Sequence, residues 1–365
     1  MMRIVIASSI TIRGGAWRYI KDQAVGLRER GCDVTMALPA GASQLRSEAA
    51  KLGLRVQGTT PHTQTDIWHF HLADTYDPQV IRALPLARLV SRSVLITEHL
   101  PRSDASDPSV RADGQVQSFG AWPAKTALKR AQYAMCERVI CPSESSRQFV
   151  LLRYGIDQRK VTTVPCGIPM SSLPPDPWPS GSPLFVGIGA IIVQKGFDVL
   201  IEAAALAREP WQAVIIGDGP HLTALQARAS ALRVPVRFTG WSNDVTPALA
   251  SASALVAPSR WESSSYVAME AMAQGRPVVA TRVDGLSDIV VDGSTGLLVR
   301  PNDPKALAAA LDRLASDPSF AQMLGRTSRE RVKLFSFDAM VEALLSVYSD
   351  SLSRGLRTTT DRTRL

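Results

Sequence analysis

Cysteine is scarce in this chain, and no two cysteines are spaced as a redox or metal-binding pair. The 365 residues include four cysteines, with no C-x-x-C among them and no histidine at metal-ligand spacing. Disulfide frameworks and zinc modules need a denser pattern than this. We therefore expect four reduced thiols in a cytoplasmic protein, namely Cys32, Cys136, Cys141 and Cys166.

Long apolar runs and acidic metal motifs are missing as well. No stretch of about 20 apolar residues occurs, so we expect no segment that spans a membrane. The opening MMRIVIASSI is typical of a short strand and not of a signal peptide. Because no D-x-D motif and no His/Asp cluster with metal spacing occurs, we expect neither a metal ion nor a cofactor.

The net charge of +8 is placed unevenly. Residues 1–170 hold 22 basic and 14 acidic side chains, whereas residues 171–365 hold 19 of each. An excess of this kind fits a solvated basic face, and it fits attraction to an anionic membrane surface or a phosphate-bearing acceptor equally well. No nucleic-acid-binding motif accompanies it, so we expect no nucleic acid as partner.

Strand-like runs alternate with helical runs in both halves, which predicts parallel sheets covered on both faces. The first half opens with strand Arg3–Ala7, and the alternation restarts at strand Leu184–Gly187 after a segment rich in proline and serine. We expect an α/β protein with two Rossmann-like doubly wound domains facing across a cleft. The expected bounds are 1–170, a linker at 171–183, a second domain at 184–334, a helix at 335–350 that crosses back to the first domain, and a disordered tail at 351–365.

The densest set of polar residues next to a strand end lies at 258–290. Strand Ala254–Ala257 ends there, which places Glu262 at the carboxyl end of a parallel strand, where ligands bind. One of three following serines should cap the next helix and leave free N–H groups for a ligand. Glu270 lies one to two turns into that helix, where its carboxylate can accept both hydroxyls of a ribose. Taken singly, each glutamate is an ordinary surface residue.

The assembled pattern resembles the E-x7-E signature of glycosyltransferase family 4, whose fold is GT-B. In this sequence it runs P-S-x-x-E, ending at Glu262, then E-A-M-A-x-G-x-P-V-V-A from Glu270 to Ala280. The resemblance covers nearly the whole chain. It implies that the second domain binds a nucleotide sugar, with Glu270 on the ribose and Glu262 near the transferring sugar, while the first domain takes the acceptor. It also implies retention of the anomeric configuration.

A second segment, Gln194–Ala205, resembles the lysine-glycine segment of the family. By that resemblance Lys195 neutralises the donor diphosphate as its charge develops, an electrostatic role that is often the largest catalytic contribution. The family usually has an arginine where Ala190 stands here. We expect a weaker site or a substitute such as Arg260 or Arg13.

Two glycine turns and two histidines complete the expected site. The GDGP turn follows a strand and is used near the base in the family, and the Gly14–Gly15 turn faces the diphosphate there. His99 matches the family's histidine near the donor sugar, and we favour it over His71 as functional. The expected catalytic residues are Lys195, Glu262 and His99, and the expected donor-binding residues are Gly14, Gly15, Gly217, Asp218, Gly219, Arg260, Ser263, Ser264, Ser265 and Glu270.

The run Trp122–Cys136 predicts a basic amphipathic helix carrying Lys125, Lys129 and Arg130. It fits interfacial contact with a membrane or packing with a solvated basic face. We expect a retaining, metal-independent glycosyltransferase that moves a sugar from a nucleotide-sugar donor to a saccharide or lipid-linked acceptor at the inner face of the membrane. The alternatives are a nucleotide-sugar epimerase of the same fold, and a catalytically weakened homologue that serves as a scaffold.

Overall fold

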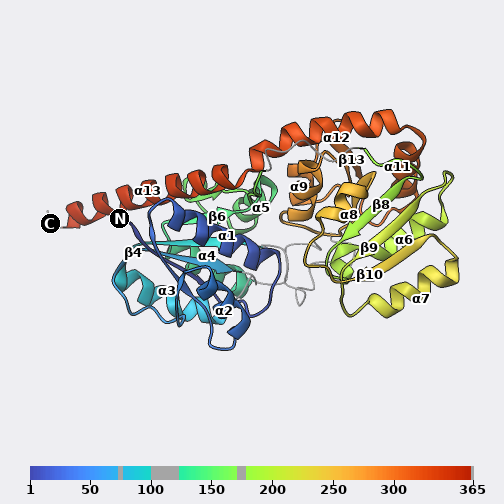
Figure 1. Ribbon diagram of the computed structural model, residues 1–365. Coiled ribbons are helices and arrows are strands. Elements are labelled where there is room, and N and C mark those ends of the chain that lie inside the picture. Colours follow the sequence, from blue (N-terminus) through green and yellow to red (C-terminus); the bar gives the residue numbers. More distant parts are fainter. Residues whose placement is uncertain (73–76, 100–122, 171–177, 363–365) are drawn as a thin grey trace. The chain divides into compact units, whose positions relative to one another are not determined.

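The computed structural model describes residues 1–72, 77–99, 123–170 and 178–362, which form two compact units (Figure 1). Unit 1 consists of Met1–Gly167 together with Phe337–Leu365, and unit 2 of Ile168–Ser336. Each unit is built on its own parallel sheet, which confirms the expected α/β class with two doubly wound domains. Most of the expected linker, 171–177, lies outside the described residues.

The sheet of unit 1 has seven parallel strands in the order β3-β2-β1-β4-β5-β6-β7. Strands β4 and β5 are buried almost from end to end, as expected for central strands with helices on both faces. The elements are β1 (Arg3–Ser8), α1 (Gly15–Glu29), β2 (Asp33–Ala37), α2 (Ser43–Lys51), β3 (Arg55–Gln57), β4 (Thr65–Leu72), α3 (Pro78–Val90), β5 (Ser91–Glu98), α4 (Pro123–Ala134), β6 (Arg138–Cys141), α5 (Glu144–Tyr154), η1 (Gln158–Lys160), β7 (Val161–Thr163) and α13 (Phe337–Arg362).

Helix α13 belongs to unit 1, although it follows unit 2 in the sequence (Figure 1). It packs against α1 and β5. The contact with α1 is close enough that a Cβ atom at Gly26 would lie 2.3 Å from Val341 Cγ2. Arg30 adds an ion pair of 2.8 Å to Asp338 at the exposed edge of this contact. The helix extends to Arg362, so the segment expected to be a disordered tail from 351 is instead helical over most of its length.

Unit 2 has a six-stranded parallel sheet in the order β10-β9-β8-β11-β12-β13. One large apolar cluster joins its central strands to α6, α11 and α12. The elements are β8 (Leu184–Ile188), η2 (Val193–Lys195), α6 (Phe197–Ala205), β9 (Gln212–Ile216), α7 (Leu222–Leu232), β10 (Val236–Gly240), α8 (Thr246–Ser251), β11 (Ala254–Ala257), α9 (Tyr266–Ala273), β12 (Val278–Thr281), α10 (Asp284–Ile289), β13 (Gly296–Val299), α11 (Pro304–Ser316), α12 (Pro318–Val332) and η3 (Lys333–Phe335).

The strand order reverses once in each sheet, and these reversals locate the candidate sites. In unit 2 the chain proceeds outward from β8 through β9 to β10, and then returns to β11 on the other side of β8. In unit 1 the same reversal separates β1 from β4. The connections leaving the carboxyl ends diverge at such a point, so a crevice forms there and ligands of open α/β sheets bind in it.

Candidate functional site

Two residues of the predicted site meet at the reversal point of unit 2. Lys195 ends the turn that follows β8, and Glu262 lies in the loop after β11. The Lys195 ammonium donates a hydrogen bond to Glu262 Oε2, and both side chains line one pocket. Lys195 keeps 24% of its side chain exposed and Glu262 keeps 10%. The pair is therefore partly buried, with its cation still within reach of a ligand.

The loop after β11 is held in place by main-chain hydrogen bonds to its neighbours. The Arg260 N–H donates to Gln194 O at 2.7 Å, and the Gln194 side-chain amide donates to Trp261 O at 3.0 Å. On the other side, the Gly285 N–H donates to Glu262 O at 2.8 Å. Two separate segments thus fix the backbone that carries Glu262.

The three serines lead directly into α9, as the sequence predicts. Ser265 is the N-cap, and its hydroxyl accepts a hydrogen bond of 3.3 Å from the Ala268 N–H. Ser263 and Ser264 are half-buried, and Glu270 lies half-buried in the second turn of α9. Ser265 also lines the pocket shared by Lys195 and Glu262. The structure therefore brings the start of α9 together with the Lys195–Glu262 pair.

Arg260, the candidate substitute for the arginine missing at position 190, is bound within unit 2. Its guanidinium donates two hydrogen bonds to the Asp198 carboxylate, at 2.9 and 2.6 Å, and one of 2.6 Å to Val193 O. Partial burial opposes ionisation of Asp198, but the bonds from Arg260 and from the backbone outweigh it and lower the pKa of that carboxyl. Arg260 thus ties the loop after β11 to the first turn of α6.

Arg13, the other substitute considered, lies in unit 1 and is likewise paired. Its Nε donates a hydrogen bond of 3.0 Å to Glu48, and about half of its side chain is exposed. Surface pairs of this kind are weak, so Arg13 can exchange Glu48 for another anion at little cost.

The GDGP turn follows β9 and packs against the turn after β8. A Cβ atom at Gly217, whose φ is +151°, would lie 1.9 Å from Gly189 O, so this position needs glycine. The Asp218 carbonyl accepts a hydrogen bond of 2.8 Å from Ile191 N–H, and its carboxylate accepts one of 2.7 Å from Gly219 N–H. The turn is therefore a tightly fitted part of the same carboxyl edge.

The glycines of unit 1 are in a different setting. Gly14 and Gly15 begin α1 after the loop that follows β1, and an added Cβ would meet nothing within 4 Å at either position. Both are exposed. The α1 helix has no side-chain cap at this end, so N–H groups of its first turn lack a partner within the helix and can face an anion.

His99 directly follows β5 in unit 1 and lies in a cluster with two further buried histidines. Its Nε2 is 3.0 Å from Nδ1 of His71 on β4. The ring of His71 is in turn 4.3 Å from the ring of His69, centroid to centroid. The β4–β5 register, which pairs His71 with Thr97, brings these side chains to one face. Sequence reasoning missed His69, although the alternation in WHFH places both β4 histidines on one face of a buried strand.

Helix α4 differs from the expected basic surface helix. Lys129 is fully buried and forms an ion pair with the equally buried Glu98, whose pKa burial raises despite the lysine. Arg130 donates a 2.6 Å hydrogen bond to Tyr154 O. Trp122 lies outside the described residues, and nothing is described of the Lys125 side chain. Lys129 is thus withdrawn from the expected basic face, whereas Arg130 stays exposed, which weakens the support for a membrane-binding face on α4.

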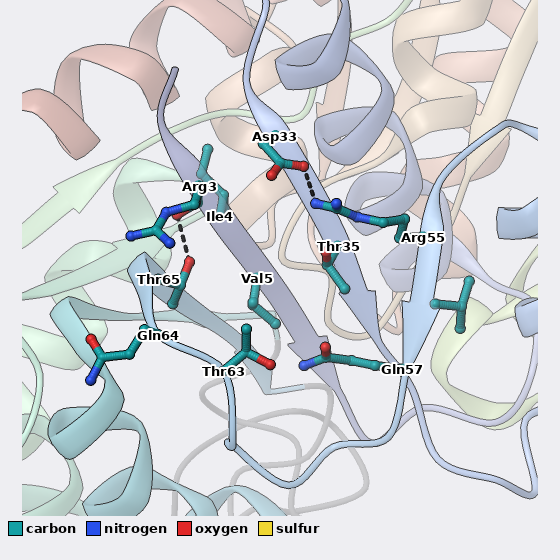
Figure 2. A pocket seen from close by; sticks show the side chains of 11 residues that line it. Arg3, Ile4, Val5, Asp33, Thr35, Arg55, Gln57, Thr63, Gln64 and Thr65 are labelled. Atoms are coloured by element: carbon teal, nitrogen blue, oxygen red, sulfur yellow. Dashed lines mark hydrogen bonds and ion pairs between the residues drawn. The ribbon is translucent and has the colours of Figure 1, made fainter.

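A separate pocket lies on unit 1 toward the amino ends of β1, β2 and β3 (Figure 2). Its polar groups bond to one another: Arg55 pairs with Asp33, and the Thr65 hydroxyl donates to Arg3 O at 2.7 Å. None of the predicted site residues lines it. It lies at the opposite ends of the strands from the reversal point, so we do not assign the chemistry to it.

The described part of the chain lacks two features that would point to another kind of site. No group of three or more His, Cys, Asp or Glu residues could hold a metal ion there. Among the described helices, none combines the length and apolar character that crossing a membrane requires.

Comparisons with known proteins agree across both units. Residues 182–317 match the family described as Glycosyl transferases group 1, and residues 13–172 match Glycosyltransferase Family 4. The lipopolysaccharide core biosynthesis glycosyltransferase LpsE of Rhizobium meliloti is 35% identical over 355 residues, covering 92% of this chain and 95% of LpsE. The D-inositol 3-phosphate glycosyltransferase of Kineococcus radiotolerans is 28% identical over 311 residues, covering 76% of this chain and 67% of that protein.

Among solved structures, the complex of Anabaena Alr3699/HepE with UDP matches with a TM-score of 0.81 at 15% identity, covering 96% of this chain and 100% of the other. The apo form of the lipopolysaccharide outer core galactosyltransferase WaaB matches with a TM-score of 0.72 at 16% identity, again covering 96% and 100%. At such identities the likeness establishes the fold alone.

Proposed function

The chain belongs to glycosyltransferase family 4, and from that premise we propose that it transfers a hexosyl unit, with retention, from a nucleotide-diphosphate sugar to an acceptor hydroxyl. The observation that carries the proposal is the Lys195–Glu262 pair at the reversal point of unit 2, directly before the capped helix that holds Glu270. A cation, a carboxylate and the amino-terminal end of a helix converge there, which suits an anionic donor.

In the proposed reaction the acceptor oxygen bonds to the anomeric carbon while the bond from that carbon to the diphosphate breaks. The acceptor proton passes to the departing diphosphate, which leaves from the same face. Lys195 neutralises the charge that builds up on this leaving group, the kind of contribution that is often the largest in catalysis. Its partly exposed ammonium allows the donor phosphates to approach. No metal ion is needed in this scheme.

Glu270 holds the donor ribose in this proposal, and Glu262 lies beside the transferring sugar. Ser263 and Ser264 follow Glu262 in the same loop and are half-buried, so their hydroxyls are available to bond sugar hydroxyls. The GDGP turn, fitted against the turn after β8, takes the side of the base. Gly14, Gly15 and His99 supply the contribution of unit 1.

For the acceptor we propose a saccharide of a cell-surface glycolipid, met at the inner face of the membrane. Support comes from LpsE, which is described as a glycosyltransferase of lipopolysaccharide core biosynthesis. The basic excess within residues 1–170 is consistent with an acceptor or a surface that carries phosphate.

One observation favours a second candidate, a weakened homologue that acts as a scaffold. Ala190 stands where the family usually has an arginine, and Arg260 is bound to Asp198. Such a protein would bind nucleotide poorly or fail to turn over. An epimerase of the same fold would bind the donor, but would release free nucleotide without any acceptor.

The test is a thermal-shift and calorimetric panel of UDP, GDP, ADP and their common sugars. We would measure the wild type, Glu270→Ala and the control Glu202→Ala, which removes a surface carboxylate of α6 paired with Arg228. At about 100 Kd the right nucleotide should stabilise the protein by roughly 2.7 kcal/mol. We expect one nucleotide to shift the wild type and the control but not Glu270→Ala. If none shifts the wild type, the donor site is wrong and the scaffold is favoured.

A further inference from the structure

The proposed reaction uses His99 and leaves the two histidines behind it without a role. His69, His71 and His99 form a continuous row, in which the His71 ring lies tilted at 39° against the His69 ring and is hydrogen-bonded to His99. The Tyr19 ring of α1 covers His71 and His99 edge to face, with centroids 6.0 and 5.4 Å away. All three histidines are buried, and none is paired with a carboxylate among the described residues.

Burial fixes the charge of the row. It lowers the pKa of His69 and of His99 to about 3, and it lowers the pKa of His71 well below its usual value, with the neighbouring histidines adding to the effect. At neutral pH each ring is therefore uncharged, with one N–H and one bare nitrogen. The hydrogen bond between His71 and His99 then has a direction, since one ring must donate and the other accept.

The other ring nitrogen of His71, Nε2, decides which of the two rings donates. Its Nε2 is buried and has no hydrogen-bond partner among the described residues. If His99 donated, His71 would carry its own proton on this Nε2 and bury an N–H with no acceptor. If His71 donates from Nδ1, a bare nitrogen is buried instead. Among backbone groups, buried N–H groups without an acceptor are rarer than acceptors without a donor. By the same preference, donation by His71 is favoured.

We propose that His71 is a positioning residue: it donates from Nδ1 to His99 Nε2 and thereby fixes His99 as the tautomer that carries its proton on Nδ1. His99 then offers the substrate a hydrogen-bond donor and not a base. In this proposal the Nδ1–H of His99 donates to an oxygen of the bound nucleotide sugar. The inference rests on the proposed function for the meaning of this contact, although the tautomer itself belongs to the free protein.

His69 provides the internal contrast. Its Nδ1 is 2.7 Å from the Tyr348 hydroxyl of α13, and its Nε2 is 2.7 Å from the Thr97 hydroxyl. Hydroxyl groups both donate and accept, so neither tautomer of His69 leaves an orphan. His69 thus anchors α13 to the sheet without dictating where a proton lies. Of the two histidines of β4, His71 is the one whose environment selects a tautomer.

The test reads the tautomers directly by nitrogen NMR of the full chain labelled with ¹⁵N-histidine. The chain has five histidines, so single substitutions can assign each signal. We expect His99 and His71 to carry their protons on Nδ1 at neutral pH. A proton on Nε2 of His99 in the wild type would overturn the proposal. This reading needs no substrate, so it stands or falls apart from the proposed reaction.

Three variants separate positioning from packing. His71→Leu removes the donor, and we expect His99 to become a mixture of tautomers and kcat to fall about tenfold, with the donor KM nearly unchanged. His71→Asn places a carboxamide N–H where Nδ1 was, and should restore both the tautomer and most of kcat. Tyr348→Phe, the control, removes a hydrogen bond to His69 and should lower the melting temperature without moving the His99 signals. An unchanged His99 tautomer in a folded His71→Leu protein would refute the role of His71.

Discussion

The carboxyl edges of the two sheets differ in the charge and exposure of their polar side chains. In unit 1 the edge holds imidazoles that burial keeps neutral, bonded to one another and to hydroxyls, beside the fully buried pair of Glu98 with Lys129. In unit 2 it holds charged pairs, Lys195 with Glu262 and Arg260 with Asp198, each with part of its surface in water. Both edges lie at a reversal of strand order, so topology alone does not set this chemistry.

The difference follows from the cost of burying charge. An isolated buried charge costs many kcal/mol unless it is paired, whereas a neutral ring needs only hydrogen bonds. A site for an anionic diphosphate must keep a cation available, which requires contact with water or with the ligand. The unit 2 edge meets that requirement, and the unit 1 edge supplies directional hydrogen bonds instead.

The largest effect should come from removing the cation of unit 2. Lys195→Ala should lower kcat about 10²- to 10³-fold, since the loss of one electrostatic contact to a developing negative charge typically costs that much. Steady-state kinetics with the donor found in the nucleotide panel would measure it. Lys333→Ala, which breaks an exposed pair with Glu330 in the same unit, is the matched control and should keep its rate. Equal losses in both variants would show that the charge acts at long range.

A smaller effect is expected when a glycine in the turns of the two units is replaced by alanine, and it should differ between the units. Gly217→Ala forces a Cβ against Gly189 O at a positive φ, and should destabilise unit 2 by about 2–4 kcal/mol. Gly15→Ala meets nothing and lies in a helix, so it should leave unit 1 unchanged or slightly more stable. Urea unfolding followed by tryptophan fluorescence would compare them. A tolerated Gly217→Ala would mean that the turn after β8 moves away easily.

The next effect in size is that of acid, which should destabilise unit 1 more than unit 2. The unfolded chain binds protons on its histidines near pH 6.5, whereas folding lowers the pKa of His69 and His99 to about 3. Stability is therefore complete above pH 6.5 and is lost as the pH falls toward 3, with a slope of up to ~1.4 kcal/mol per pH unit for each histidine. Hydrogen exchange between pH 7 and 5 should show unit 1 opening first. Earlier opening of unit 2 would contradict the buried neutral row.

The smallest effect concerns Arg260. If its role is to hold Asp198, Arg260→Lys should cost about 1 kcal/mol through loss of the two-pronged bond, with donor affinity unchanged. Calorimetry would measure the donor affinity, and urea unfolding of the same preparation would measure the stability. A tenfold loss of affinity at unchanged stability would show instead that Arg260 reaches the donor, which would give the unit 2 edge a second cation for the ligand.

Particular residues mark how far sequence reasoning reached. Lys195 lies in the turn after a strand, and Ser263 to Glu270 lie at the start of one helix. Both are short local segments, so their sequence pattern indicated where they would lie in the fold. Lys129 shows the opposite case. Helical periodicity put it on a basic face, but its partner Glu98 lies on β5, and the pattern of one helix says nothing about a carboxylate buried beneath it.

The sequence by itself determined the fold class and the family, through the alternation of strands and helices, the proline-rich break between the halves and the E-x7-E pattern. The same pattern predicted the order of the site residues along the second half of the chain. Only the tertiary structure decided which side chains became partners. His71 and His99 are 28 residues apart, and Lys195 and Glu262 are 67 apart. Such pairs form when parallel strands align in one register, because the side chains at neighbouring strand ends then meet whatever the sequence between them.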